Sequence, residues 1–440
     1  MDNVILFTTV RPAFGPVPSG VRTMSSSSPM PPARLVNTVR PYAWGSVRAL
    51  AELLGEEPTG EPQAELWMGA HPGAPSLVDR GAGPRALDEL IAADPVGELG
   101  PAVLERFGAR LPFLFKVLAV GQALSVQVHP TLAQARAGFA DEEARGIPVD
   151  APERTYRDGN HKPEMICALS GFDALCGFRP CAETADLLDA LRLPVLDRWA
   201  KTLRTAPEPE ALRTVLAEAL GDERGSGTAY AVAAALPGAA AAAAAAGGPH
   251  AAALAAYAAV VRDYPGDPGI IAALLLNHVR LSPGQALYLG AGVPHAYLGG
   301  LGVEVMANSD NVLRCGLTPK HIDVPELLRV VDFRATAPTV VDPRPVPGSA
   351  GDDVYPAPVD EFLLNRHTLT GAAQSVDGEG GPQILLCVAG EAALVDADGE
   401  SLRLTRGQSA YLPAAAGPVQ VESDDAVLFR VSVPSPAVQK

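Results

Sequence analysis

The clearest secondary-structure signal in the chain is a strict alternation of apolar and polar residues at 124–129. The apolar residues face one side of such a strand, and Ser125, Gln127 and His129 face the other. Comparable short apolar runs, separated by glycine and proline turns, extend over residues 35–180. This pattern predicts a β domain built from short strands.

The composition changes to that of helices over residues 181–264. Alanine and leucine dominate there, and both have high helix propensity. We interpret the octa-alanine run Ala239–Ala246 as variable padding inside an α-helical insertion. Pro237 and Gly238 are expected to interrupt the apolar stretch around it. We therefore expect no run of about 18 apolar residues and no transmembrane helix.

Strand patterns resume after a turn at 264–269 and a short apolar helix predicted at 270–276. The proline-rich segment 335–358 is interpreted as a linker. Residues 361–433 again contain short strands between turns, which favours a second β-sandwich or barrel. Between the helix and the linker, the expected strands are 278–281, 286–289 and 302–307.

An internal repeat supports this duplicated architecture. Gly284–Gly290 resembles Gly407–Pro413, and both are similar to the second cupin motif. His295 follows the first copy, whereas Pro418 stands at the equivalent position of the second, so only the first barrel is expected to hold a metal. The predicted fold is mainly β, with two cupin-like jelly-roll domains and an α-helical insertion domain. The expected segments are a disordered lead-in (1–32), a catalytic cupin domain in two parts (33–180 and 265–335), the helical insertion (181–264), and a linker with a C-terminal cupin-like domain without a metal site (336–440).

Charge and cysteine content narrow the class of protein. The formal net charge of -16 argues against nucleic acid or an anionic membrane as the main partner, but a local cationic pocket is enough for a small phosphorylated ligand. The five cysteines form no CxxC pair and indicate reduced thiols in a cytoplasmic protein. We expect no secretory signal, because no basic segment precedes the first apolar run. The chain also lacks a Walker A loop and a GxSxG elbow.

Four residues form a candidate metal-ligand set. Gln127 and His129 share one strand face, Glu164 follows a polar turn, and His295 follows the tight turn of the cupin-like motif. Their mixed nitrogen and oxygen donors suit Zn²⁺ or a similar divalent ion with one position open for substrate or water. A lone QxH pair is more often a structural polar pair, but here three separate segments each offer a ligand.

Lysine is rare, with only five residues, and three of them fall among these motifs. Lys116 lies within an apolar run, where its ammonium must reach solvent or an anion. Lys162 is two residues from Glu164, and Lys320 follows the polar stretch that contains Arg314. Such a cationic cavity fits a phosphorylated, polyhydroxylated ligand.

These motifs make the chain similar to the class I mannose-6-phosphate isomerases. They occur in the family's order over residues 35–330, and the last block is the most specific. The matching stretches are Tyr42–Ser46, Ala64–Pro72, the strands of Lys116 and of Gln127 and His129, Asn160–Glu164, Pro294–Tyr297 and Glu304–Lys320.

The resemblance implies one Zn²⁺ ion in the catalytic domain, bound by the four residues named above. It implies a zinc-dependent aldose–ketose isomerase that interconverts mannose 6-phosphate and fructose 6-phosphate through an enediol. Such an enzyme supplies mannose for GDP-mannose and glycan synthesis or feeds it into glycolysis. Arg314 is then the usual active-site residue, in a pocket shared with Lys162, Glu304, Asp310 and Tyr297. We expect a cytoplasmic monomer whose partner is a small phosphorylated sugar, without nucleic acid or membrane partners.

The chemistry assigns further roles. Lys162 is expected to act as base, and His161 to assist ring opening. Arginine holds its proton tightly, so we assign Arg314 to electrostatic stabilisation of the enediolate. Lys116 and Ser125 are expected to receive the phosphate. Further candidate substrate-binding residues are Lys320, Trp44 and Glu65, the last within the motif Ala64–Pro72. The alternative for Lys320 is a surface charge without a role, and the alternative for Trp44 is core packing.

Two other functions stay open at this point. A metal-dependent cupin oxygenase or decarboxylase usually has three histidines with one carboxylate, whereas this set has two histidines and a glutamine. A non-catalytic sugar-phosphate-binding cupin does not require Lys162, Glu304 and Arg314 together. The remaining histidines are interpreted as structural or solvent-facing: His71, His250, His278, His321 and His367.

Overall fold

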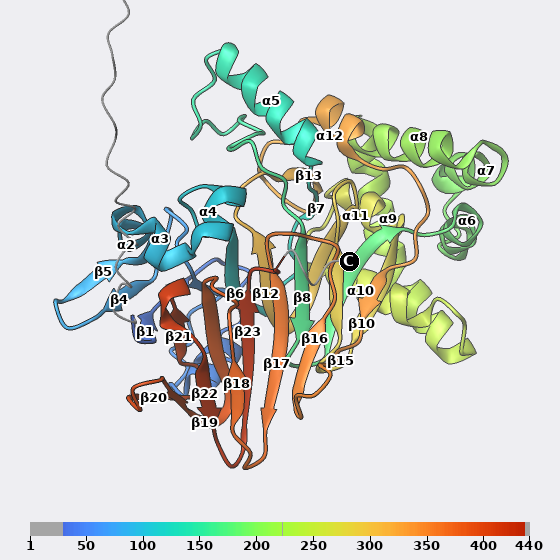
Figure 1. The fold of residues 1–440 in the computed structure, drawn as a ribbon. Helices are drawn as coiled ribbons and strands as arrows, with labels where there is room; N and C mark the ends of the chain where they lie inside the picture. Colours follow the sequence, from blue (N-terminus) through green and yellow to red (C-terminus); the bar gives the residue numbers. More distant parts are fainter. Residues whose placement is uncertain (1–29, 222, 436–440) are drawn as a thin grey trace, which may run out of the picture.

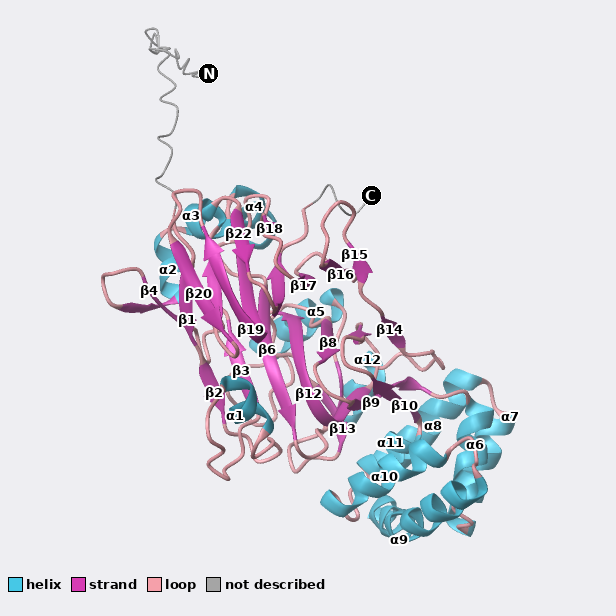
Figure 2. Cartoon of the chain, turned by 90° about the horizontal axis from the view of Figure 1, so that it is seen from below, coloured by secondary structure: helices cyan, strands magenta, loops and turns pink. Residues whose placement is uncertain are grey.

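The computed structural model describes residues 30–221 and 223–435. Most of the expected lead-in at 1–32 lies outside the described residues. Two antiparallel β sandwiches lie side by side, and a group of helices covers one end of the first (Figures 1 and 2). The chain is therefore mainly β with a helical insertion, as predicted.

The first sandwich contains an 11-stranded sheet. Its strands are β2 (Thr38–Arg40), β3 (Glu65–Met68), β6 (Phe113–Val120), β7 (Val126–Val128), β8 (Glu164–Ala168), β9 (Phe172–Phe178), β10 (Leu276–Leu281), β11 (Ala286–Leu289), β12 (His295–Ala307), β13 (Leu313–Gly316) and β14 (Thr339–Val341).

The second sandwich contains a 12-stranded sheet. Its strands are β1 (Ala33–Val36), β4 (Leu77–Asp79), β5 (Pro84–Ala86), β15 (Arg344–Pro345), β16 (Asp352–Tyr355), β17 (Leu363–Leu369), β18 (Gln374–Val376), β19 (Gln383–Val395), β20 (Ser401–Thr405), β21 (Ser409–Leu412), β22 (Val419–Glu422) and β23 (Ala426–Ser432).

Most helices precede β6 or lie between β9 and β10. They are α1 (Ala49–Leu54), α2 (Leu87–Ala93), α3 (Pro95–Leu99), α4 (Pro101–Phe107), α5 (Leu132–Ala144), α6 (Cys181–Ala190), α7 (Asp197–Thr205), α8 (Glu208–Gly221), α9 (Glu223–Ala246), α10 (Ala251–Asp263), α11 (Gly269–Leu274) and α12 (Val324–Val330), with 3₁₀ turns η1 (Pro194–Leu196) and η2 (Ala414–Ala416).

The long strand β12 belongs to both faces of the first sandwich. Its beginning pairs with β7 and β9, and its end pairs with β6 and β8. Apolar side chains from β6, β8, β9 and β12 fill the space between these faces, Tyr297 among them. The opposite side of the same strands, including Phe115 and Val303, packs against Ile384 and Phe429 of the second sandwich. The two sandwiches thus share one apolar core, and the interior of the first holds a second apolar cluster together with buried polar groups such as Lys116 and Glu304.

Two expectations about the connections are wrong. The segment 335–358 is not a free linker, because β14 pairs with β11 of the first sandwich and β16 pairs with β17 of the second. The expected division at residue 336 also does not match the sheets, since β1, from the N-terminal part of the chain, pairs with β21. The pairing of β1 with β21 joins strands hundreds of residues apart, and a local pattern carries no information about it.

Pro237 and Gly238 do not interrupt the alanine-rich stretch. Helix α9 runs through Pro237, which is exposed, so water can hydrate the carbonyl that the proline leaves without a donor. The long alanine run favours the helix, and buried positions such as Val232 and Leu236 pack with α10. Gly227–Ala246 is long and apolar enough to cross a membrane by length and composition alone. One such helix is weak evidence, since core helices of soluble proteins meet the same criterion.

Candidate metal centre and active site

Three strands bring two histidines and one glutamate together inside the first sandwich. His129 directly follows β7, Glu164 begins β8 and His295 begins β12. The turn before β12 requires Gly292, whose φ of 78° lies in the left-handed region. The Gly292 N–H donates to the His129 carbonyl at 2.9 Å. The turn that delivers one histidine is thereby fixed to the residue that supplies the other.

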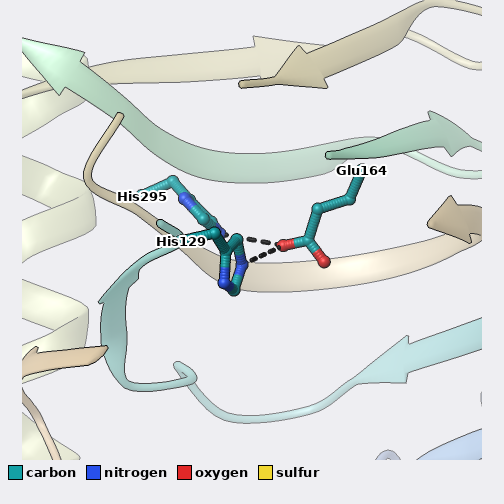
Figure 3. Close-up of side chains that lie close together, drawn as sticks. All are labelled: His129, Glu164 and His295. Atoms are coloured by element: carbon teal, nitrogen blue, oxygen red, sulfur yellow. Dashed lines mark hydrogen bonds and ion pairs between the residues drawn. The ribbon is translucent and has the colours of Figure 1, made fainter. Parts of the chain in front are cut away.

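The three side chains converge on one carboxylate oxygen (Figure 3). Glu164 Oε1 lies 2.7 Å from His129 Nε2 and 3.1 Å from His295 Nε2. All three residues are buried, and their potential ligand atoms lie within 4.8 Å of one another. This is the geometry of a preformed site for a small cation.

The hydrogen bonds of the two imidazoles test whether a metal fits. His129 Nδ1 lies 2.8 Å from the Asn311 carbonyl, and His295 Nδ1 lies 2.9 Å from the Val293 carbonyl. A carbonyl only accepts, so each Nδ1 carries a proton, and in the neutral form of each ring Nε2 presents a lone pair. Burial lowers the pKa of His129 to about 4, which keeps this ring neutral at pH 7. The Nε2 atoms of two neutral rings and the carboxylate oxygen of Glu164 are all acceptors, and a divalent cation would satisfy all three.

The fourth predicted ligand, Gln127, lies beside this group. On β7 it is the direct partner of His295 on β12 and of Arg314 on β13. Gln127 is half-buried. The strand register therefore brings Gln127, His295 and Arg314 to one location, although Arg314 is 187 residues from Gln127 in sequence (314 minus 127).

A lysine approaches the other oxygen of the carboxylate. Lys162 Nζ lies 3.7 Å from Glu164 Oε2, and its side chain is 11% exposed. Burial alone would raise the pKa of Glu164, but Lys162 and His129 outweigh it and hold that pKa well below its ordinary value. Glu164 is thus a carboxylate at neutral pH, which is the form that binds a metal.

Lys116 forms a buried ion pair beside the same site. Its Nζ lies 2.6 Å from Glu304 Oε2, across directly paired positions of β6 and β12, and the Tyr297 hydroxyl donates to Glu304 Oε1 at 2.9 Å. Burial alone would lower the pKa of Lys116, but the nearby carboxylates, Glu304 above all, outweigh it and raise that pKa. Lys116 also lies 5.9 Å from the centre of the Trp67 ring, whose indole N–H donates to Glu65. A polar stripe therefore crosses the interior face of the sheet.

Two loops at the mouth of the site are joined through Asp158. Its carboxylate accepts from the Ser309 hydroxyl at 2.9 Å and from the Asp310 backbone N–H at 2.8 Å. The Asn311 side chain donates to the Asp158 carbonyl and accepts from the Arg157 backbone N–H, both at 2.7 Å. These bonds fix the positions of the segments that carry Lys162 and Arg314.

Sequence reasoning missed Arg157. Burial and the neighbouring Arg157 lower the pKa of Arg314, and burial, Arg314 and Arg157 lower that of Lys320. In the described part of the chain, none of these three cations has a carboxylate within ion-pair distance. The signal for Arg157 was its place directly before Asp158 and the Asn160–Glu164 motif. The result is a local cationic group in an acidic protein.

Two acid–histidine pairs also border the site, and one partner of each was not anticipated. His161 Nε2 lies 2.6 Å from Glu361 Oε1, which precedes β17 of the second sandwich. His71, interpreted from the sequence as structural or solvent-facing, lies with Nε2 3.2 Å from Asp310 Oδ2. This contact is the main reason why the pKa of Asp310 is lowered. No local pattern signals Glu361, because it is 200 residues from His161.

The remaining candidates lie nearby but with fewer specific contacts. Ser125 is half-buried directly before β7. Trp44 is half-buried, stacks on Tyr42 with ring centres 5.8 Å apart, and packs against the apolar interior of the first sandwich. Among the histidines set aside, His278 pairs with Asp173 at 2.9 Å. Trp44 thus has the packing contacts that the sequence left as an alternative to ligand binding.

Comparison with known proteins gives one consistent family. Residues 33–181 match the family model for the catalytic domain of phosphomannose isomerase type I, and residues 352–433 match that for the mannose-6-phosphate isomerase cupin domain. The mannose-6-phosphate isomerase of Escherichia coli is 43% identical over 88% of this chain and 96% of its own length. The mouse enzyme of that name is 33% identical over 90% of this chain and 94% of its own length.

Solved structures agree with these sequence relatives. A crystal structure of a phosphomannose isomerase variant from Salmonella typhimurium superposes with a TM-score of 0.83 at 38% identity, covering 92% of this chain and all of that one. A zinc-bound structure of a mannose 6-phosphate isomerase superposes with a TM-score of 0.82 at the same identity and coverage.

Proposed function

Because the chain belongs to the type I phosphomannose isomerases, we propose that it interconverts mannose 6-phosphate and fructose 6-phosphate. The observation that carries this proposal is the buried group of His129, Glu164 and His295, beside the cations Lys162 and Arg314. The comparisons do not favour the alternatives of an oxygenase or a non-catalytic binding protein.

The cofactor is zinc, and we propose Gln127, His129, Glu164 and His295 as its ligands. Two histidines, a carboxylate and an amide oxygen match the donors that zinc accepts. When bound, zinc would polarise the sugar oxygens at the reacting carbons. The carbonyls of Asn311 and Val293 orient the imidazoles for this purpose.

We assign ring opening to His161 and proton transfer to Lys162. A carboxylate that holds one imidazole nitrogen leaves the other free to exchange a proton, and Glu361 holds His161 in this way. Lys162 is nearly buried beside Glu164, and this position supports its amine as the group that moves the proton between the reacting carbons. Arg314 stabilises the enediolate that forms when the proton leaves C2.

We propose that the sugar phosphate binds to Arg157, Lys320 and the outer edge of Arg314, with Ser125 as a neutral donor. A phosphate dianion would relieve the mutual repulsion of these cations. Lys116 is reassigned, because its ammonium is engaged by Glu304. We propose that it positions Glu304 and Tyr297.

Further residues shape the pocket. We propose that Asp310 contacts sugar hydroxyls from its position beside His71, and that Trp44 and Glu65 form the inner wall. We propose a catalytic domain of residues 33–180 and 265–335, a helical insertion of residues 181–264, and a C-terminal domain within residues 336–440 that has no metal site. Strands β1 and β14 cross this division, because β1 pairs with β21 and β14 pairs with β11. The contact of Glu361 with His161 supports a contribution of the C-terminal domain to the active site.

We also propose that the enzyme is a cytoplasmic monomer that supplies mannose 6-phosphate for GDP-mannose synthesis or feeds mannose into glycolysis. The acidic net charge argues against nucleic-acid and membrane partners. All five cysteines are free, which suits a reducing compartment.

The test is a coupled assay for both directions of the isomerisation, with and without chelator, on zinc-loaded enzyme. Lys162→Met and Arg314→Gln should each reduce kcat by about 10²-fold or more while zinc content stays at one per chain. Lys201→Met, on the exposed side of α7, is the matched control and should match the unmodified enzyme. Absence of turnover in folded, zinc-loaded enzyme would overturn the proposal, and near-normal turnover of either variant would remove that residue's role.

A further inference from the structure

A cavity separate from the metal centre opens between the two sandwiches. Its volume is about 620 Å³, within the range of about 300–1,000 Å³ typical of small-molecule sites. Helix α1, the ends of β6 and β8, the middle of β12, and strands β17, β19 and β23 form its walls. Pockets at domain interfaces are a common place for ligands.

Most of the wall is apolar. It forms where the apolar core shared by the sandwiches ends, so residues such as Leu53 and Phe429 belong to both. Partly buried side chains, including Leu301 and Val388, continue this wall towards solvent. An apolar ligand body would bury the apolar side chains that line the cavity and that neither sandwich covers.

Two guanidinium groups line the same cavity. Arg366 donates to Asp353 at 2.7 Å through one terminal nitrogen, but its Nε is buried without a partner. Arg406 is exposed, and its side chain has no ion-pair partner in the described part of the chain. The one lining carboxylate, Glu52, already pairs with Arg48 at 2.6 Å. The cavity therefore carries positive charge in a protein of net charge -16.

The wall is built closely around Arg366. A Cβ atom on Gly284 would lie 2.7 Å from Arg366 Nη1, so the guanidinium occupies space that only glycine leaves open. The Gly284 carbonyl accepts from the Tyr355 hydroxyl at 2.8 Å, which ties this wall to the second sandwich. The close packing therefore prevents the Arg366 guanidinium from rotating to expose its Nε to solvent.

We propose that this cavity binds a small organic anion that has an apolar body and one anionic head group. The body lies against Leu53, Leu301 and Phe429, and the head group is bound by Arg406 and Arg366. The site does not involve the residues proposed for the isomerisation. Its lining residues Val120 and Ala168 lie four residues, roughly 13 Å, along β6 and β8 from Lys116 and Glu164. On β12 the lining residues lie three to four residues, roughly 10–13 Å, from Glu304.

Two matched dyes test the proposal on the full-length zinc enzyme. The anion is 8-anilinonaphthalene-1-sulfonate, and the neutral counterpart is N-phenyl-1-naphthylamine, which has the same ring system without the sulfonate. Arg406→Ala should weaken binding of the sulfonate about fivefold or more and change that of the neutral dye less than twofold. Ala389→Trp, at an exposed lining position, should abolish the fluorescence enhancement of both dyes. Arg85→Ala, an exposed arginine of β5, is the control and should change neither.

Each result is decisive. Absence of sulfonate binding, or unchanged binding in Ala389→Trp, would overturn the site. An equal effect of Arg406→Ala on both dyes would overturn the anionic class of ligand. Both substitutions are at exposed positions, and circular dichroism verifies that the variants are folded.

Discussion

The cationic group at the mouth of the site predicts how the enzyme recognises phosphate. We consider Arg157→Gln and Lys320→Met, which each remove one positive charge and keep most of the side chain. Neither residue has an ion-pair partner in the part of the chain that the structure describes, so neither substitution leaves a carboxylate unpaired. Any loss of activity can then be assigned to the ligand.

The expected magnitude follows from exposure. A hydrogen bond to a charged group contributes about 1.5–3 kcal/mol when it is well formed. Arg157 and Lys320 are exposed, so solvent screening reduces this to about 1–1.5 kcal/mol each, or roughly a 5- to 12-fold change. We expect KM for mannose 6-phosphate to rise by this factor in each variant. The kcat value should fall less than threefold, because phosphate binding is similar in the ground and transition states.

The assay is steady-state isomerisation combined with competitive inhibition by inorganic phosphate. The inhibition constant for phosphate should rise by the same factor as KM, and the difference between unmodified enzyme and variants should shrink at 0.5 M salt. Arg85→Gln is the control for loss of one exposed arginine. An unchanged inhibition constant for phosphate in both variants would refute the assignment, as would an equal effect of the control.

Three further predictions concern stability, pH and metal. Lys116→Met leaves Glu304 buried without its cation and should lower the free energy of unfolding, measured in urea, by about 3–5 kcal/mol. The double variant Lys116→Met with Glu304→Leu should recover most of this loss. Equal losses in the two variants would contradict the ion-pair argument. Burial and Arg430 lower the pKa of His367 in the folded chain. As pH falls below the ordinary histidine pKa of about 6.5, the unfolded chain binds a proton at this residue and the folded chain does not. The free energy of unfolding therefore falls by up to about 1.4 kcal/mol per pH unit. His367→Asn should flatten this slope between pH 7 and 5 in urea titrations, and an unchanged slope would show that His367 does not carry it. Zinc stabilises the folded enzyme by about 2.7 kcal/mol where free zinc is 100 times its Kd, so chelation should lower the Tm of the unmodified enzyme. The Tm of Glu164→Gln should not fall, because its zinc content should already be low. An equal drop in both would contradict Glu164 as a ligand.

The metal centre was predictable because each of its parts is a local pattern. Strand alternation brings Gln127 and His129 to one side, and a short turn places His295 at the start of a strand. The pairings were not predictable in the same way. Lys116 and Glu304, or His161 and Glu361, meet only through sheet register or domain contact. The sequence lists these charged residues but does not indicate which of them pair with one another in the fold.

The same distinction explains the wrong expectations about the connections. Proline-rich composition correctly indicates the absence of helix in 335–358, but short edge strands form there because their neighbours offer unpaired backbone groups. Pro237 is normally a helix breaker, yet α9 tolerates it because the long alanine run around it favours the helix and the proline lies on the exposed side. In both cases the neighbouring residues overrode the expectation drawn from composition.

Strand β6 links these observations to the proposed second site. Its sequence, FLFKVLAV, is buried throughout, which follows from having a sandwich core on each side. The side that carries Phe115 packs on the second sandwich, so the other side bears the only polar group, Lys116. Four residues further along, Val120 lines the cavity between the sandwiches. The strand is held by apolar packing along its length, so a ligand that completes this packing at Val120 acts on the element that positions the Lys116–Glu304 pair. Filling the cavity with Ala389→Trp is therefore the change that can reveal coupling to catalysis without touching a catalytic residue.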